Sequence, residues 1–600
     1  MTDARWWSQP FAPEGSQAAE GIANQLGRPS LDPLEVLVRE AAQNSWDART
    51  GSDRVRFRIS LQQLGGRADA WGQLLAPGPT DLPAGGLSEA LTPESMVWIV
   101  SDRGTVGLGG PIRAGIKAEP NQRSDFVQFM RNVGEPRDTE LGGGTYGFGK
   151  GIFYRLSGPG VIVANSRAGQ GADHRMMGAA IGNSFYVGER RYTGRHWWGI
   201  VNDNVPDPLL GEDAEGIGAQ LGLPGFIGDE TGTDIIVVGA QLGMNKNNEP
   251  RTPHEAGTFV ASAILWHLWP KLVGEEAVRM HFTVDVDGAE IEIPDPASVN
   301  SLFPFVDALE SVRDGSGSQY TRASEPKDVG RLAIEIGVSR ADDVSEVVEV
   351  ARPFELPAHH VARMRQAELV VDYREGPLHP NPSLAYGAVF RASIDADSHF
   401  AAAEPPTHDD WIEKGLIGTD RGVVQGARHF VEKQLKSRFE GGVVAAGSEG
   451  VGLASLSKRL GSILDRVATQ PKSTSNGDGG SAGGGGGGSR AGAVRVLEPA
   501  RLVVDGSAPF VVSRVRIGAR AAASNYLATA VVKLDGGASE GAAPLNSATP
   551  RIIQWAPVGG GDPVPGPGIR LEPGDDSDWW VYANYIPLAV VDISVRKVDQ

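Results

Sequence analysis

The spacing of hydrophobic and polar positions predicts a first half in which strands and helices are intermixed. Apolar runs typical of strands occur at 55–62, 96–101, 160–166, 178–187 and 233–240. Apolar residues at helical spacing occur at 34–49, 124–133, 149–155 and 255–272. This mixture is typical of an α/β two-layer sandwich, which we expect over residues 31–275. The stretch 66–95 is rich in Gly and Pro and is predicted to be an insertion loop.

The remainder of the chain divides by composition. Residues 1–30 read as an irregular N-terminal leader. Over 276–445 we expect a second α/β domain, with a hairpin at 280–293 that turns at Asp287-Gly288. Its other predicted elements are strands at 331–339, 345–351, 367–373 and 385–393 and a helix at 425–439. A helical segment at 446–470, a flexible Gly/Ser linker at 471–492 and a β-sandwich-like domain at 493–600 complete the prediction.

Charge and cysteine content narrow the classes of function. The formal net charge of −18 argues against a protein that coats nucleic acid by bulk electrostatics. The absence of cysteine excludes disulfides and thiolate metal sites. No apolar run has the length of a membrane span, and the N-terminus lacks the pattern of a secretory signal. We therefore expect a cytoplasmic protein without a membrane partner.

Two further segments contain residue types that are typical of functional sites, but an ordinary structural role is favoured for each. The segment 185–198 combines Arg190, Arg191 and Arg195 with aromatic residues, which suits nucleic-acid contact, but a β-hairpin with packed aromatics is favoured. Several histidines lie within 359–408, yet their spacing matches no metal motif. Loop and core histidines are the favoured interpretation there.

The helix predicted at 34–49 has an unusual polar face. Glu40, Asn44 and Asp47 are spaced by four and three residues, which places them on one side of a helix. Another side has an apolar stripe made of Leu34, Leu37, Ala41, Ser45 and Ala48. Ser30 is the predicted N-cap, with Pro33 in the first turn. A buried helix with two carboxylates and a carboxamide on one face indicates a ligand site.

Three later segments contain sequence motifs that belong together with the polar face of this helix. They are VWIVSDRGTVGLGGP at 97–111, GGGTYGFGKG at 142–151 and TGTDIIVVG at 231–239. Together with the helix, they resemble the four motifs of the GHKL ATPases, which include gyrase B subunits, MutL proteins, heat-shock chaperones, MORC proteins and histidine kinases. The E-x-x-x-N-x-x-D helix resembles the N box of that family. Asp102-x-Gly104 resembles its first glycine box, Gly144-x-x-Gly147-x-Gly149 the second, and Gly232-Thr233 its threonine-bearing strand.

The resemblance covers about residues 20–275 and has departures. Two residues separate Gly104 from Gly107, whereas the family pattern has one, so Gly107 is a less direct match. Lys150 is not part of the minimal second glycine box. GTYGFGKG also looks like a P-loop, but Gly151 stands where that motif needs Ser or Thr, so that interpretation is rejected.

The resemblance implies a Bergerat-type fold that binds ATP and Mg²⁺, with assigned roles. Glu40 would activate the attacking water, and Asn44 would hold the magnesium ion. Asp102 would accept a hydrogen bond from the adenine amino group, supported by Thr233. Gly104, Gly107 and the glycines of 142–151 would approach the nucleotide. Lys150 would either contact phosphate or cap a turn. Asp47 would contact the cofactor or form an ion pair with Arg49 or Arg103.

The expected activity is Mg²⁺-dependent ATP hydrolysis that closes a lid, brings two subunits together and acts on a protein or DNA client. DNA processing and phage defence are the pathways that the resemblance suggests. A non-hydrolysing ATP-dependent scaffold or sensor is the alternative. A histidine kinase is disfavoured, because few residues precede Glu40 and the first histidine of the chain is His174. The gyrase, MutL, chaperone and MORC branch is therefore the nearest.

Overall fold

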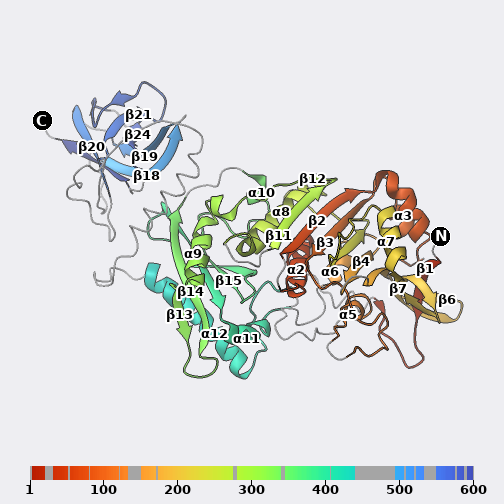
Figure 1. Cartoon of the computed structure of the whole chain (residues 1–600). Coiled ribbons are helices and arrows are strands. Elements are labelled where there is room, and N and C mark those ends of the chain that lie inside the picture. Colours follow the sequence, from red (N-terminus) through yellow and green to blue (C-terminus); the bar gives the residue numbers. More distant parts are fainter. Residues whose placement is uncertain are drawn as a thin grey trace. The chain divides into compact units, whose positions relative to one another are not determined.

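The computed structural model separates into two compact units (Figure 1). The first comprises Met1–Pro380 and Ala385–Glu440, and the second comprises Asn381–Leu384 and Gly441–Gln600. The residues that the structure describes are 3–19, 31–51, 54–79, 81–119, 122–132, 150–169, 173–274, 280–339, 345–405, 407–439, 494–505, 508–518, 522–532, 549–574, 577–586 and 591–598. Within these ranges, no helix combines the length and apolar composition that crossing a membrane requires.

The first unit is built on a 12-stranded sheet. Its main path runs β1 (Ala4–Pro10), β7 (Arg190–Asn202), β5 (Asp173–Ile181), β4 (Val161–Ala168), β10 (Gly232–Val238), β3 (Met96–Arg103), β2 (Val55–Gln63), β11 (Met280–Val286) and β12 (Ala289–Glu290). Three short strands are added at its side: β6 (Phe185–Val187), β8 (Val205–Asp207) and β9 (Leu209–Leu210). The pairing is antiparallel except between β2 and β11.

Both ends of this sheet differ from the sequence prediction. Residues 4–10 of the expected irregular leader form an edge strand that pairs with β7. The predicted hairpin at 280–293 is confirmed, with Asp287 and Gly288 at positive φ in its turn. It joins the first sheet, so this sheet extends beyond residue 275, where the second domain was expected to begin.

Helices cover both faces of the sheet, so the arrangement has three layers where two were predicted. One face is covered by α2 (Pro33–Asp47), α5 (Asp125–Met130), α6 (Gly151–Arg155) and α8 (Pro253–Leu268), which pack on Trp98 and Val100. The other is covered by α3 (Ala68–Leu75), α4 (Leu87–Ala90) and α7 (Gly211–Gln220), which pack on Val97 and Ile99. Alternate side chains of β3 therefore enter two different cores. The predicted insertion loop at 66–95 supplies α3 and α4, because Trp71 and Leu75 are apolar anchors within a Gly- and Pro-rich stretch.

Helix α2 has a different N-cap from the one predicted. Asp32 is its N-cap, since the Asp32 carboxylate accepts a hydrogen bond from the Leu34 N–H at 2.9 Å, and Pro33 occupies the first turn. Ser30, the predicted cap, lies outside the described residues. Helix α8 begins at a capping box in which Thr252 and Glu255 satisfy each other's backbone N–H groups.

The second region of this unit has its own five-stranded sheet, in the order β13 (Ser318–Thr321), β14 (Asp328–Val338), β17 (Leu384–Ala392), β15 (His359–Met364) and β16 (Val370–Glu375). Its helices are α9 (Phe303–Arg313), α10 (Glu346–Glu349), α11 (Asp397–Ala401) and α12 (Gly418–Phe439). Among the described residues of the first unit, 3-10 turns lie at Gly65–Arg67, Trp269–Lys271, Pro296–Ser298 and Ile394–Ala396. The predicted strand at 345–351 is wrong, because residues Glu346–Glu349 form α10, whose buried Val347 and Val348 account for the apolar signal.

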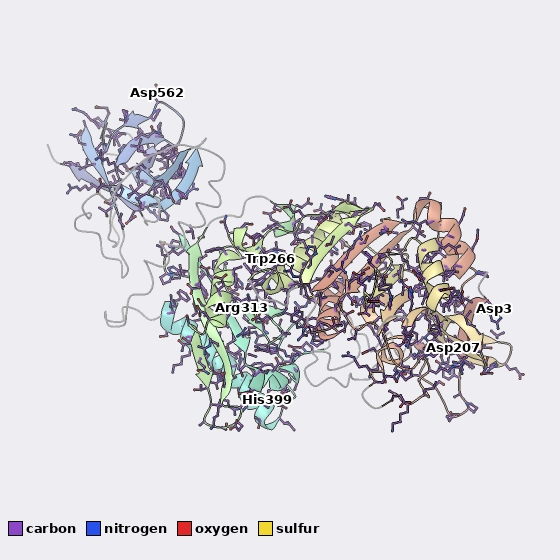
Figure 2. All side chains as sticks on the ribbon, in the orientation of Figure 1. Asp3, Asp207, Trp266, Arg313, His399 and Asp562 are labelled. Carbon is purple, nitrogen blue, oxygen red and sulfur yellow. The ribbon has the colours of Figure 1, made fainter. Side chains whose placement is uncertain are left out.

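One continuous core joins the first sheet to this second region. Trp266 of α8, labelled in Figure 2, is fully buried and belongs to this shared core. Its indole N–H donates to the Val348 carbonyl at 2.9 Å, and its own carbonyl accepts from the Tyr373 hydroxyl at 2.6 Å. The two regions therefore share tertiary contacts that reach from α8 to β16.

The second unit is a two-sheet β structure, as predicted for 493–600. One sheet has the order β18 (Val494–Asp505), β19 (Ala508–Ile517), β24 (Ser577–Asn584), β21 (Ile552–Pro557) and β22 (Val564–Pro565). The other has the order β23 (Gly568–Leu571), β20 (Ser524–Val532) and β25 (Val591–Val598). Their inner faces share a core that includes Val515, Tyr526 and Trp555. The predicted helical segment at 446–470 and linker at 471–492 lie outside the described residues.

Candidate functional site

Three neighbouring strands bring three polar residues to one face of the first sheet. In the register of β10, Thr233 lies opposite Asp102 of β3 on one side and Ser166 of β4 on the other. Directly paired residues of adjacent strands point to the same face. Residues far apart in the sequence thus form one row across the sheet, and α2 packs above it.

The Asp102 carboxylate is held by three donors. Its Oδ1 accepts from the Thr105 hydroxyl at 2.5 Å and from the Thr233 N–H at 3.0 Å, and its Oδ2 accepts from the Ser45 hydroxyl at 2.9 Å. Burial raises the pKa of Asp102 above its ordinary value, although these hydrogen bonds work in the opposite direction. With two lone pairs on each oxygen, Oδ1 is saturated and Oδ2 retains one acceptor position.

A small cavity of about 70 Å³ lies beside this carboxylate. Asn44 and Ser45 of α2, Asp102 and Thr233 line it, together with apolar side chains that include Phe129, Phe153 and Ile235. Pockets that enclose a whole ligand usually measure ~300–1000 Å³. The cavity is therefore of a size for the edge of a flat ring, with an acceptor at its wall.

The loop after β3 turns at two glycines. Gly104 has φ of +79° and Gly107 of +66°, a region that favours glycine. A Cβ at Gly107 would lie 2.3 Å from the Arg167 carbonyl oxygen, so the loop passes directly against β4. The next residue donates its N–H to the Ser166 hydroxyl at 2.8 Å. Despite its altered spacing, Gly107 lines the same cavity as Asp102.

The structure brings together some of the predicted site residues and separates others. Asn44, Asp102, Gly107 and Thr233 line one cavity, whereas Asp47 lines a different one on another side of α2. Gly144, Gly147 and Gly149 lie outside the described residues. Helical spacing alone predicted that Asn44 and Asp47 would share one site. In the structure, α2 is oriented about its axis so that Asn44 lines the small cavity and Asp47 lines the other.

Lys150 and the expected partners of Asp47 have defined contacts. The buried Lys150 ammonium donates to the carbonyls of Gln128 and Asn132, so it contacts the end of α5, and its contact with phosphate stays a prediction. Arg103 pairs with Asp234 at 2.9 Å on the opposite face of the sheet from Asp102. Arg49 donates to the Trp46 carbonyl at 2.8 Å and lies over the Trp46 ring.

Glu40 lies one turn before Asn44 on α2 and is 6 % exposed. Its charge acts on His408 of the second region. Burial works to lower the pKa of His408, but the hydrogen bond to Glu404 and the charge of Glu40 hold it above its ordinary value. The His408 Nδ1 lies 2.6 Å from the Glu404 carboxylate. The candidate catalytic carboxylate therefore has an imidazole from the second region in its electrostatic environment.

Arg39, which the sequence did not single out, ties α2 to the second region. Its guanidinium donates to the carbonyls of Val371, at 2.8 Å, and His408, and to His267 Nδ1 at 2.9 Å. Arg39 itself is buried. A charged residue within an otherwise apolar helical pattern, directly before Glu40, was the available signal in the sequence.

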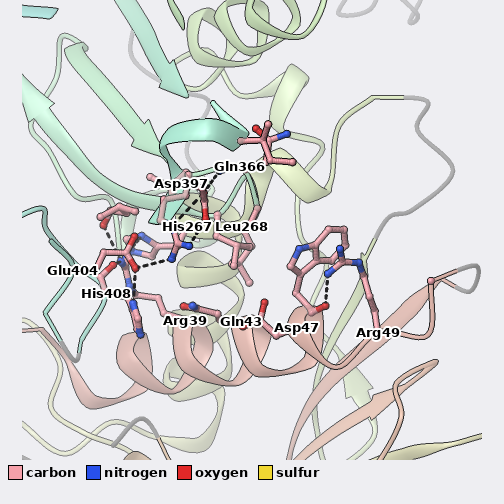
Figure 3. A pocket seen from close by; sticks show the side chains of 18 residues that line it. Arg39, Gln43, Asp47, Arg49, His267, Leu268, Gln366, Asp397, Glu404 and His408 are labelled. Atoms are coloured by element: carbon pink, nitrogen blue, oxygen red, sulfur yellow. Dashed lines mark hydrogen bonds and ion pairs between the residues drawn. The ribbon is translucent and has the colours of Figure 1, made fainter. Parts of the chain in front are cut away.

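Arg39 and Asp47 face the second cavity, which measures about 520 Å³ (Figure 3). Residues of the second region complete its lining, and most of their charges are paired. Arg365, for example, bonds to Asp397 and lies 3.3 Å from Glu404. This cavity marks the joint between α2 and the second region. Across the described part of the chain, no group of His, Asp and Glu has the arrangement of a metal site.

The arginine- and aromatic-rich segment at 185–198 forms the favoured hairpin, with β6 paired to β7. Arg191 lies 4.2 Å from the Phe11 ring, and Arg195 lies 4.8 Å from the Trp197 ring. These cations pack on aromatic rings of the same unit.

The sequence matches no protein-family model and no curated protein.

Proposed function

We propose that this protein binds and hydrolyses ATP with Mg²⁺, in the manner that its resemblance to GHKL ATPases implies. The observation that carries the proposal is the Asp102 carboxylate. Three donors fix its position, and one acceptor position remains beside a cavity that Asn44 and Thr233 also line. The amino group of adenine is a donor that fits this position, whereas the corresponding carbonyl of guanine is not.

Glu40 and Asn44 suit the phosphate end of the same nucleotide. A carboxamide oxygen and waters are ligands that Mg²⁺ prefers, so Asn44 would hold the ion through its side-chain oxygen. The ion supplies positive charge against the phosphate oxygens when it is bound. Glu40, one helical turn away and buried, would orient the attacking water and receive its proton.

The contacts of α2 support coupling between this site and the rest of the unit. Arg39 bonds to carbonyls of the second region, and His408 of that region lies within the electrostatic reach of Glu40. A shift of α2 on nucleotide binding would therefore alter packing in the second region. Subunit dimerisation and action on a protein or DNA client belong to this proposal as the output of that coupling.

Hydrolysis of γ-³²P-ATP by the full chain, with nucleotide binding measured in parallel, tests the proposal. Glu40→Ala should keep binding and lose about 100-fold or more in turnover, because general-base groups contribute ~10²–10⁴-fold. Glu94→Gln, which changes an exposed carboxylate, is the matched control and should hydrolyse like the parent. A parent that binds ATP but never turns it over would support the scaffold alternative. Radiolabel transferred to a histidine would support the kinase alternative.

A further inference from the structure

A second cavity lies on the opposite face of the same three strands. Asp102 and Thr233 line the small cavity of about 70 Å³, and Ser166 is on the same face of the sheet. Their chain neighbours Arg103, Asn165 and Asp234 face the other way, because successive strand residues alternate. There a cavity of about 510 Å³, here called the back pocket, lies between this face, α7 and the loop at 223–228. Its volume falls within the ~300–1000 Å³ that ligand sites usually have.

A chain of hydrogen bonds orients a histidine at the back pocket. Arg103 donates to Asp234, and the Asn165 amide donates to the same carboxylate at 3.1 Å. The Asn165 oxygen is thereby directed to His174, whose Nε2 lies 2.7 Å away and must be the donor. Burial lowers the pKa of His174, which favours the neutral imidazole. His174 Nδ1 is then an acceptor, and His174 lines the pocket.

The remaining lining is acidic and apolar. Glu212 and Glu215 of α7 line the back pocket and are exposed to solvent. The opposing cation of the lining is Arg167, whose guanidinium donates to the Gly228 carbonyl at 2.6 Å. Arg103 lies behind the Phe226 ring, at 4.0 Å from its centre, and its charge is balanced by Asp234. The pocket therefore offers two carboxylates and an imidazole acceptor against one engaged guanidinium.

Apolar residues adjoin the lining on the outside. Leu210 is 48 % exposed and precedes Gly211 of the lining, and Ile227 is 79 % exposed between Phe226 and Gly228. Exposed apolar side chains beside a cavity favour a partner with apolar surface of its own. A small free amine brings at most a short alkyl chain, whereas a peptide also brings neighbouring apolar side chains.

We propose that the back pocket binds a peptide that inserts a lysine or arginine side chain between α7 and the loop at 223–228. The cationic group lies against Glu212, Glu215 and His174 Nδ1. The aliphatic stem lies along Phe226, and the neighbouring peptide residues contact Leu210 and Ile227. This binding needs no nucleotide, so it stands or fails independently of ATP hydrolysis.

Ligand-observed saturation-transfer NMR on the full chain tests the inference with the peptide acetyl-Leu-Lys-Leu-amide. The parent should bind it saturably, and the same peptide with an acetylated lysine should not bind, because acetylation removes the charge. Changing Glu212→Gln and Glu215→Gln together should weaken binding by about fivefold or more, as for exposed charge pairs. Glu189→Gln, at the exposed β6–β7 turn, should leave binding unchanged.

The outcomes are decisive in both directions. Equal binding of the acetylated peptide, or unchanged binding after the paired glutamate substitutions, would overturn the proposal. Butylamine is the second probe, since it carries the same cationic group without a peptide. If butylamine binds as tightly as the peptide, the assignment of a peptide partner is overturned. Both glutamates are exposed, so their substitution does not threaten the fold.

Discussion

Under the proposed nucleotide-binding function, replacing Asp102 by asparagine should change which base is preferred. The Thr105 hydroxyl and the Thr233 N–H both donate to Oδ1, and the carbonyl oxygen of the new carboxamide can take that place. The amide nitrogen then takes the place of Oδ2. One of its N–H groups meets the Ser45 hydroxyl, which can rotate to accept, and the other points into the cavity. The substitution thus converts the remaining acceptor into a donor with little change of shape.

The size of the effect follows from this reversal. Loss of a hydrogen bond that leaves a buried polar group without a partner costs ~1–3 kcal/mol, which weakens ATP binding by about 5- to 150-fold. A ligand with a carbonyl in that position, such as GTP, should bind better to Asp102→Asn than to the parent. Folding stability should change little, because burial already raises the pKa of Asp102 and the charged form gains no net stability from its surroundings.

Titration calorimetry of ATP and GTP against both proteins measures the ratio of the two dissociation constants. Asp69→Asn on the exposed side of α3 serves as the control and should keep the ratio of the parent. Thermal unfolding of each variant separates a binding effect from a folding defect. An Asp102→Asn protein that remains folded and binds ATP as tightly as the parent would show that Asp102 does not recognise the base.

Three further predictions concern the joint, the loop and the buried histidines. Arg39→Met should lower the free energy of unfolding by about 3 kcal/mol, because two carbonyls and an imidazole lose their charged donor. Urea unfolding measures this loss, with Arg56→Met as the control. Gly107→Ala should cost about 1–3 kcal/mol and weaken ATP binding, since its Cβ would meet a backbone carbonyl at positive φ; unchanged stability would show that the loop can move. Burial lowers the pKa of His196 and of His360 to about 4. Their contribution to the free energy of unfolding is therefore fully present above about pH 6.5 and is lost as the pH decreases toward 4. The loss is about 3 kcal/mol for His196 and smaller for the less deeply buried His360, and a His196→Gln variant whose urea midpoint falls as steeply with pH as that of the parent would contradict this.

Local periodicity was sufficient for most elements near the site. The strands at 55–63, 96–103 and 232–238 and the helix at 33–47 lie close to where the alternation of apolar residues placed them. Their signals are local, since burial of one face imposes a period of two or 3.6 residues on the sequence itself. The failures at 66–95 and 345–351 have one cause: a short helix with few apolar anchors gives a pattern too short to distinguish from a loop or a strand.

The components of the candidate site could be identified in the sequence alone: Glu40 and Asn44 one turn apart on a helix, Asp102 at the end of a strand, and glycines where the loop must turn. How these residues are oriented toward one another depends on the strand pairing and helix packing of the folded chain. The register of β3, β4 and β10 places Asp102 and Thr233 on one face and Asp234 on the other. Because of the orientation of α2 about its axis, Asn44 lines one cavity and Asp47 lines another. Periodicity predicts which residues share a face, but it carries no information about what that face contacts. The residues paired with Thr233 lie 67 and 131 positions away in the chain, and their packing is a property of the whole core.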